Sequence, residues 1–377
     1  MRIKLCGVIA AIALFIGSAS VQAASVTIGP SALPTTGPLP PNICAGILGN
    51  PIYSVLVTAC TKGLINRQSL INTSTSIRNV IVDRFDKGPN QEEPAGLELS
   101  DPNEILQRLS GNGEIIIAPT AGAPAAAPSK WNIWTDGKYS WLNDTSAVSN
   151  LDGSLINTVI GADYKVTDRL VLGLMGTYED SRLKGSGLLP PTQKTNGWGG
   201  GAYMGLTLTD NLVFSANVLG TSLDTTTNGV VKFDSERWQT SEALTGYWYS
   251  GTWRFSPSLT FAWSKEWQDS VGPIHAQTIE TAIVSPAMQI GDTISIGGAN
   301  TVEPWLGAEI DWAVRNRVKD KVIGTIVDDP NTDLRLQTGL NFAFGANAQL
   351  ALTAEMSGIL LSKSDTYTAG ANFAYQF

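Results

Sequence analysis

The sequence has few charged residues and no long hydrophobic run. Charged residues make up 15% of the 377 residues, against roughly 25% in soluble domains. After residue 18, no apolar stretch reaches the ~20 residues that a membrane-spanning helix needs, and the mean hydropathy is only +0.03. These shortages exclude a typical soluble enzyme and a helical membrane protein. Acidic residues outnumber basic ones by 33 to 25, so the chain has no electrostatic attraction for nucleic acid.

Groups that usually carry catalysis are also scarce. The chain has one histidine, His275, and no second histidine that could complete a histidine-based metal site. The sequence contains no Gly-x-Ser-x-Gly motif, no phosphate-binding loop and no Cys/His cluster. We therefore predict no catalytic residue, no cofactor and no metal, and we interpret His275 as a surface or loop residue.

The first 23 residues have the three parts of a secretory signal peptide. Arg2 and Lys4 give a positively charged start, Leu5–Gly17 is a 13-residue apolar core, and Val21–Ala23 offers a cleavage site. We predict that this segment is removed on export.

Export places the two remaining cysteines, Cys44 and Cys60, in an oxidising compartment. A disulfide between them would close a loop of about 17 residues and contribute about 3 kcal/mol. The alternative is a pair of reduced, buried thiols. We predict the disulfide.

Tryptophan is confined to one part of the chain, because all eleven lie between Trp131 and Trp312. Residues 24–129 hold 12 of the 19 prolines, and their only aromatic residues are Tyr53 and Phe85. This composition is poor for a hydrophobic core. It places a domain boundary near residue 129.

The region before that boundary is expected to be short and mostly irregular. We assign residues 24–118 to a passenger-like or periplasmic segment and residues 119–129 to an Ala/Pro-rich linker. One short helix is predicted at Asn103–Leu109, and the apolar residues around the cysteines suit one short helix or strand pair. Residues 130–377 form the second domain.

From Trp131 onward, apolar and polar residues alternate, which predicts strands with one apolar and one polar face. The apolar faces are clearest at Leu334, Leu336, Thr338, Leu340, Phe342 and Phe344, and at Tyr367, Ala369, Ala371, Phe373, Tyr375 and Phe377.

Four features favour a membrane barrel, with its apolar face outward, over a soluble sandwich. The predicted strands have about ten residues, whereas strands of soluble proteins have about five to six. Aromatic residues cluster at the strand ends, as membrane interfaces require. The chain carries an export signal, and its connections alternate between short and long.

The connections also predict the number of strands. Five short turns alternating with six longer polar loops give an all-β fold, a 12-stranded antiparallel transmembrane β-barrel with both ends on the short-turn side. The short turns are expected at Thr167–Arg169, Thr209–Asn211, Ser250–Gly251, Gly297–Asn300 and Gly345–Asn347. The longer loops are expected near Asn143–Asn150, Ser181–Asn196, Asp224–Gly229, Gln268–Pro273, Asn316–Asn331 and Ser362–Asp365.

Several of these segments resemble a known family. Ile160–Gly173 is similar to the strand–turn–strand signature of autotransporter translocator domains. Trp198–Met204, followed by Thr209–Leu212, resembles the next hairpin of that family, and Val302–Leu306 resembles a later strand. With the terminal Phe377, these motifs occur in the same order as in that family, over residues 130 to 377.

The resemblance implies a barrel that carries an N-terminal passenger across the outer membrane and anchors it there. It also implies a barrel-insertion signal formed by Phe373, Tyr375 and Phe377, and a helix that threads the pore just before the first strand. This chain departs from that pattern, because the stretch before Trp131 is rich in Ala and Pro. Its passenger has only 106 residues, with no β-helix repeats.

The polar strand faces predict a lumenal polar cluster. One interpretation is a selectivity or passenger-contact ring. The other, which we favour, is a salt-bridged polar plug that stabilises a narrow barrel, because buried charges have to be paired. The basic run Arg315–Lys321 would touch surface sugar phosphates or form a solvated loop, and we expect the loop. The cluster consists of Glu303, Glu309, Asp311, Arg315, Arg335 and Glu355.

Three hypotheses follow. The first is an autotransporter-type barrel in the outer membrane of a Gram-negative bacterium, which anchors and exports its N-terminal segment. The second is a small-solute channel or structural protein whose N-terminal segment stays periplasmic or plugs the lumen. The weakest is a barrel enzyme, because His275 lacks the serine two residues later that twelve-stranded outer-membrane phospholipases carry. The expected partners of this monomer are outer-membrane lipid, the barrel-insertion machinery and periplasmic chaperones.

Overall fold

The computed structural model describes most of the second domain and one segment before it. The predicted signal peptide, Cys44, the predicted helix Asn103–Leu109 and the linker 119–129 lie outside the described residues, as does the side chain of Cys60. The described ranges are 52–86, 130–144, 151–185, 192–271, 275–322, 324–328, 331–345, 347–361 and 364–377.

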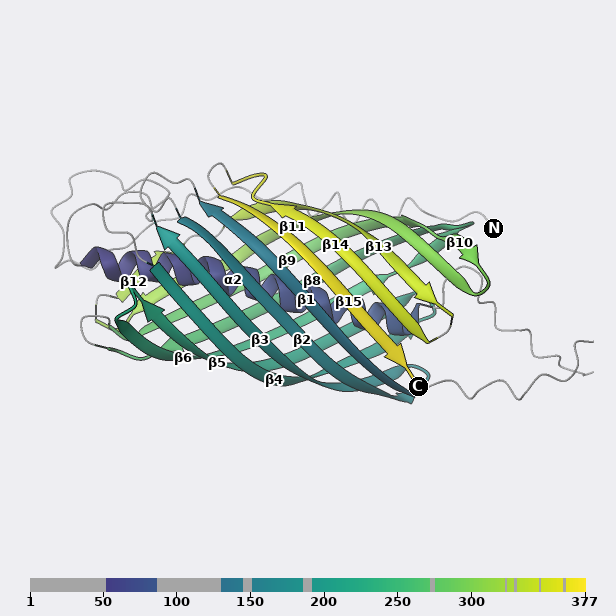
Figure 1. Cartoon of the computed structure of the whole chain (residues 1–377), viewed down its shortest axis with the longest axis horizontal. Helices are drawn as coiled ribbons and strands as arrows, with labels where there is room; N and C mark the ends of the chain where they lie inside the picture. The colour runs from purple at the N-terminus through teal and green to yellow at the C-terminus, as the bar shows by residue number, and fades with distance from the viewer. Residues whose placement is uncertain are drawn as a thin grey trace, which may run out of the picture.

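Twelve antiparallel strands cross from one end of a closed barrel to the other, which confirms the predicted fold class (Figure 1). Each strand pairs with its neighbours in sequence, and the last pairs with the first. The crossing strands are β1 (Trp131–Asp144), β2 (Leu151–Thr167), β3 (Leu170–Gly185), β4 (Thr192–Thr209), β5 (Leu212–Thr227), β6 (Val231–Gly246), β8 (Trp253–Gln268), β9 (Gln277–Asp292), β11 (Asn300–Asp320), β13 (Thr332–Phe344), β14 (Ala348–Ser357) and β15 (Ser364–Gln376). The short strands β7 (Trp248–Ser250), β10 (Ile294–Gly297) and β12 (Gly324–Asp328) extend this sheet at its rims.

The outer face of the barrel is apolar and the inner face is polar, as predicted. Leu174 and Trp198 on the outer face are 71% and 70% exposed, whereas Arg335 and Gln337 on the inner face are buried. A continuous exposed apolar surface of this kind is characteristic of a protein surrounded by lipid. The alternation also holds over β13, β14 and β15, where the predicted outward residues face outward.

The two ends of the barrel differ in their connections. All five short turns lie at the end that holds the start of β1 and the end of β15, here called the short-turn end. The other, long-loop end has one unexpectedly tight connection, because residues 228–230 alone join β5 to β6. Asn228 and Gly229 have φ angles of 53° and 69°, which is the left-handed pair that a tight hairpin turn requires. The loop predicted near Asp224–Gly229 is therefore a turn.

One long helix, α2 (Ile52–Phe85), lies inside the barrel (Figure 1). The 34-residue helix replaces the short helix or strand pair expected around the cysteines. In the part of the chain that the structure describes, no helix is apolar enough over its length to span a bilayer. The N-terminal region thus contributes a polar helix to the lumen.

Candidate functional site

The lumen filled by α2 is the candidate site, and local sequence explains why this segment is helical. Ile52–Phe85 contains no proline, and Pro51 directly precedes it, a position that suits the start of a helix. The hydroxyl groups of Ser74, Thr75 and Ser76 donate to carbonyls one turn back along the helix. The Oγ1 atom of Thr75 donates to the carbonyl of Ile71 at 2.8 Å, which satisfies a polar group inside the barrel.

Nearly every side chain of α2 from Lys62 onward is buried, including Asn66, Arg67 and Arg78. A helix with polar and apolar residues on all sides has no clear amphipathic pattern. Because strands surround it, each face of α2 is matched to the wall next to it. This explains why hydrophobic periodicity failed to predict it.

The contacts at its two ends give α2 a direction. The Nζ atom of Lys62 lies 2.7 Å from the Oε1 atom of Glu266, close to the long-loop end of β8. At the other end, the Nη2 atom of Arg84 donates to the carbonyl of Lys130 at 2.9 Å, next to the start of β1. The chain therefore runs from the long-loop end to the short-turn end as it passes through the barrel.

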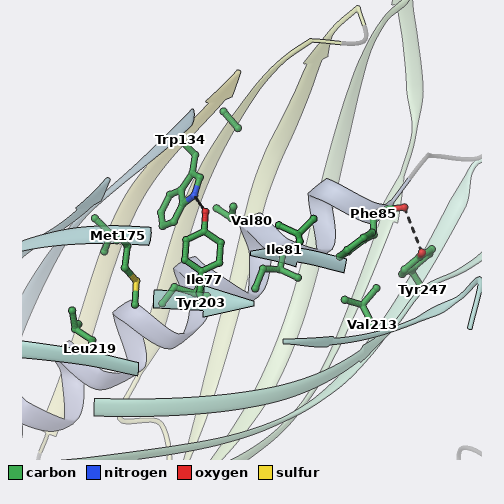
Figure 2. Close-up of a cluster of buried hydrophobic side chains, with 13 residues drawn as sticks. Ile77, Val80, Ile81, Phe85, Trp134, Met175, Tyr203, Val213, Leu219 and Tyr247 are labelled. Carbon is green, nitrogen blue, oxygen red and sulfur yellow. Dashed lines mark hydrogen bonds between the residues drawn. The ribbon is translucent and has the colours of Figure 1, made fainter. Parts of the chain in front are cut away.

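An apolar cluster holds the last three turns of α2, mostly against strands β1 to β5, with one residue after β6 and one on β15 (Figure 2). Ile77, Val80, Ile81 and Phe85 are all buried in it. Gly205 on β4 makes this approach possible, because a Cβ atom there would lie 2.5 Å from the Cγ2 atom of Ile81. The wall residues in the cluster are Trp134, Val159, Val171, Met175, Tyr203, Val213, Leu219, Tyr247 and Ala374.

A chain of hydrogen bonds joins this cluster to the end of the helix. The indole N–H of Trp134 donates to the hydroxyl of Tyr203 at 2.5 Å, as Figure 2 shows. The hydroxyl of Tyr203 donates to Asp163 at 2.9 Å, and the Nε atom of Arg84 lies 3.2 Å from the same carboxylate. The Arg84 guanidinium also donates to Gln376 at 2.5 Å. Arg84 thus connects α2 with β2 and β15.

Polar contacts hold the middle of α2. The hydroxyl of Ser69 donates to Glu179 at 2.5 Å, and that of Ser76 donates to Asp136 at 2.7 Å. Arg237 on β6 forms a very short ion pair with Glu179, so Ser69 joins a buried pair that already exists. These bonds satisfy carboxylates that burial would otherwise penalise.

Four members of the predicted lumenal cluster form one ion network. The guanidinium of Arg335 lies 2.9 Å from Glu309, 3.0 Å from Asp311 and 3.3 Å from Glu355. Lys138 approaches Glu355 at 3.1 Å. Glu303 lies in a separate pair, with an oxygen 2.5 Å from Arg254. The arrangement matches a salt-bridged wall, which is the interpretation that the sequence favoured.

Arg315 does not join this network, contrary to the expectation that it faces the lumen. The pairing of β11 with β9 shifts by one residue between Ala313 and Arg315. A β-bulge of this kind exchanges the two faces of a strand beyond it. Arg315 therefore points outward, where it is 47% exposed and lies 3.1 Å from Glu280.

A cavity of about 40 Å³ remains between α2 and one side of the barrel. This volume accommodates a few waters but no larger solute. Ion-paired side chains lie around it, including Arg78, whose Nη2 atom is 3.4 Å from Glu309. The lining also includes Asp83, Asp136, Lys138, Arg254, Asn341, Thr353 and Asn372.

The remaining predicted residues lie at the ends of the barrel. His275 sits at the long-loop end, with its Nδ1 atom 3.1 Å from Asp320. Phe373 and Tyr375 on β15 face outward, as does Phe377 directly after it, and the backbone of Phe377 pairs with Trp131 at 3.0 and 3.2 Å to close the seam. Across the described ranges, no group of three His, Cys, Asp or Glu side chains is placed to hold a metal.

Comparison with known families identifies the barrel. The model of the autotransporter beta-domain matches residues 133–355, more than half of the chain. The chain belongs to the autotransporter beta-domain family. This confirms the resemblance drawn from the hairpin motifs. Beta-domains of this family are outer-membrane translocators of Gram-negative bacteria rather than enzymes.

Solved structures of autotransporter beta-domains share this fold. The beta domain of the Bordetella autotransporter BrkA matches with a TM-score of 0.52 and 14% identity, over 66% of this chain and 100% of that one. The transport unit of the autotransporter AIDA-I from Escherichia coli matches with a TM-score of 0.52 and 12% identity, over 73% of this chain and 98% of that one. No curated protein sequence matches this chain significantly.

Proposed function

We propose that this autotransporter barrel anchors the chain in the outer membrane and holds its own N-terminal segment at the cell surface. The direction of α2 carries the proposal. In outer-membrane barrels the short turns face the periplasm and the longer loops face outside. Because α2 begins at the long-loop end and ends beside Lys130, the chain before Ile52 leaves the barrel on the outer side.

The same geometry divides the region before the barrel into two parts. After signal removal, residues 24–51 precede α2 and belong outside the cell. Residues 87–129 follow α2 and lead to β1, and both of their flanking residues, Asp86 and Lys130, lie at the short-turn end. That second segment therefore belongs in the periplasm. Export thus concerns only the shorter part of the region.

The packing of α2 supports a closed anchor over a small-solute channel. The helix contacts β1 to β6, β8, β9 and β11, and the far wall carries its own ion network. The cavity beside it at Arg78 has a volume of about 40 Å³. The channel alternative is therefore not favoured.

Insertion of this monomer would depend on periplasmic chaperones and on the outer-membrane barrel-insertion machinery. Phe373, Tyr375 and Phe377 support this, because they form an aromatic row on the outer face of the last strand. Lipid then covers the same face.

Epitope tags at residues 40 and 110 test the proposed topology. Protease is added to intact cells, and each tag is followed by immunoblotting in otherwise unchanged full-length protein. We expect the tag at residue 40 to be removed and the tag at residue 110 to be protected until the outer membrane is permeabilised.

Each of the other outcomes contradicts a stated part of the proposal. Protection of both tags in intact cells would disprove export of residues 24–51. Removal of both would place residues 87–129 outside and would contradict the direction assigned to α2. Heat-modifiable migration of both tagged proteins serves as the control that the barrel has folded.

A further inference from the structure

The bulge in β11 has a second effect, on the outer surface of the barrel. Before it, odd-numbered residues such as Glu309 and Asp311 point into the lumen. After it, Val318 and Asp320 are the buried residues, so the odd-numbered positions turn outward. Without the shifted register, three cations would enter a closed lumen. They are Arg315, Arg317 and Lys319.

These cations lie next to a fourth one on the same face. In the strand register, Lys265 on β8 is opposite Glu280 on β9, which in turn is opposite Arg317 on β11. Lys319 occupies the next outward level, across from Thr278. We call Lys265, Arg315, Arg317 and Lys319 the cationic patch. It spans three adjacent strands.

Tryptophans fix the depth of the cationic patch in the membrane. Trp263, Trp267 and Trp312 are outward-facing residues of the same strands at the long-loop end. Such aromatic belts lie at the level where acyl chains meet headgroups. In the strand register, Trp263 is level with Arg315, and Trp267 is level with Lys319. The cations therefore lie within the belt, where their long side chains reach the headgroups.

Neighbouring side chains orient two of the cations. Arg315 donates to both oxygens of Glu280 at 3.1 Å, and the indole N–H of Trp263 donates to the same carboxylate at 3.2 Å. The ammonium group of Lys265 lies 5.1 Å from the ring centre of Trp267. Asp328 on β12 is opposite Arg317 in the register. The patch keeps an excess of positive charge over these carboxylates.

We propose that the cationic patch binds the phosphate groups of the phosphorylated glycolipid in the outer leaflet. Arginine forms paired hydrogen bonds with phosphate oxygens, and the apolar outer face below the patch accommodates the acyl chains. The boundary on one side is β6, whose outward Asp234 and Glu236 repel phosphate. This assignment rests on the orientation in the proposed function, in which the long-loop end faces the outside of the cell.

A binding measurement on the purified full-length protein tests this without depending on topology in the cell. The protein in detergent is titrated with bis-phosphorylated lipid A, and in parallel with the same lipid after removal of its phosphates. We compare the wild type with the triple variant Arg315→Gln, Arg317→Gln and Lys319→Gln. The matched control removes three cations at the short-turn end by Lys130→Gln, Lys165→Gln and Arg169→Gln.

We expect the triple variant to bind phosphorylated lipid A at least about tenfold more weakly, because each basic group near an anionic surface contributes several-fold. The short-turn control should bind within about twofold of the wild type. Binding should be weakened rather than abolished, since Arg182, Lys184 and Lys194 form a smaller outward group on β3 and β4 at the same end. The single variant Lys319→Gln should bind phosphorylated lipid A about fivefold more weakly than the wild type. It keeps the test decisive if the triple variant fails to fold.

Three results would overturn the proposal. The first is equal affinity of the wild type for phosphorylated and dephosphorylated lipid A. The second is an equal loss of affinity in the patch variant and in the short-turn control. The third is full displacement of lipid A by millimolar inorganic phosphate, which would mean that the patch binds free phosphate rather than a lipid.

Discussion

Two walls of the same lumen treat α2 differently. The wall formed by β1 to β5 meets the helix with an apolar cluster, and Gly205 gives Ile81 the space to approach. The wall formed by β11 and β13 to β15 meets it through polar contacts of Arg78 and Arg84, and pairs its remaining charges around Arg335. One wall thus packs the helix with apolar side chains, while the other contacts it through a few polar groups and closes the rest of the lumen with its own ion pairs.

Removing the centre of the charged wall should have the largest effect. Arg335→Ala leaves the buried carboxylate of Asp311 without its cation and Glu309 with only the longer contact to Arg78, and breaking a buried pair in this way typically costs about 3–5 kcal/mol. Urea unfolding in detergent micelles, followed by gel mobility, measures this loss. Arg315→Ala is the matched control, because its ion pair is exposed and should contribute less than about 1 kcal/mol. Equal stability of the two variants would refute the independent role of the charged wall.

Crowding the apolar wall should release the helix without unfolding the barrel. Gly205→Leu places side-chain atoms where Ile81 and Phe85 now lie, and overpacking of this kind costs about 1–3 kcal/mol. We expect single-channel recordings to show large openings that the wild type lacks. Gly200→Leu on the same strand is the control, because its nearest contact, 3.6 Å away, is ordinary. A closed pore in Gly205→Leu would mean that α2 is not held by this wall.

Deleting one hydroxyl should show how much the hydrogen-bond chain beside the cluster contributes to stability. Tyr203→Phe removes the group that joins Trp134 to Asp163, at an expected cost of about 1–2 kcal/mol. The midpoint of urea unfolding measures it. Tyr178→Phe, on the outer face, should leave the midpoint unchanged. An equal decrease of the midpoint in both variants would mean that losing any tyrosine hydroxyl lowers stability, whether or not it belongs to the hydrogen-bond chain.

The smallest change in stability is expected at the seam where the two walls meet. Deleting Phe377 removes its two backbone bonds to Trp131 and should cost about 1 kcal/mol. Insertion in cells should nevertheless decrease clearly, because the terminal aromatic row loses its last member. Comparing refolding yield in detergent with the amount of heat-modifiable barrel in cells separates the two effects. Normal insertion of the truncated chain would argue against the terminal signal.

The barrel wall could be predicted from sequence because each strand has a single environment on each face. Leu336 meets lipid and Arg335 meets the lumen, so a period of two describes both. The short turns could be placed as well, because each one lies where this alternation stops. The bulge at Ala313 could not be predicted, because it depends on how β9 and β11 fit together, and it sent Arg315 to the opposite face.

The resemblance implied a pore-threading helix just before the first strand, but the position of this helix at Ile52–Phe85 was missed for a related physical reason. Ser69 and Ser76 face carboxylates, whereas Ile81 faces an apolar wall, so the polarity of α2 follows the barrel and not a helical period. The charged cluster was predicted as a set of residues, but its division into an Arg335 network and a Glu303–Arg254 pair depends on side-chain geometry. The sequence did contain one signal for the helix, the absence of proline between Pro51 and Pro89.

The segment between α2 and β1 makes the helix a tethered ligand of its own barrel. Residues 87–129, 43 in all, join the end of α2 to Lys130, whose carbonyl accepts a hydrogen bond from the Arg84 guanidinium at 2.9 Å. Fully extended, such a chain spans about 150 Å, whereas α2 is about 51 Å long. The helix can therefore leave the lumen completely and still find it again by an intramolecular step. Its rebinding should be first order and independent of protein concentration, with an effective concentration set by the tether.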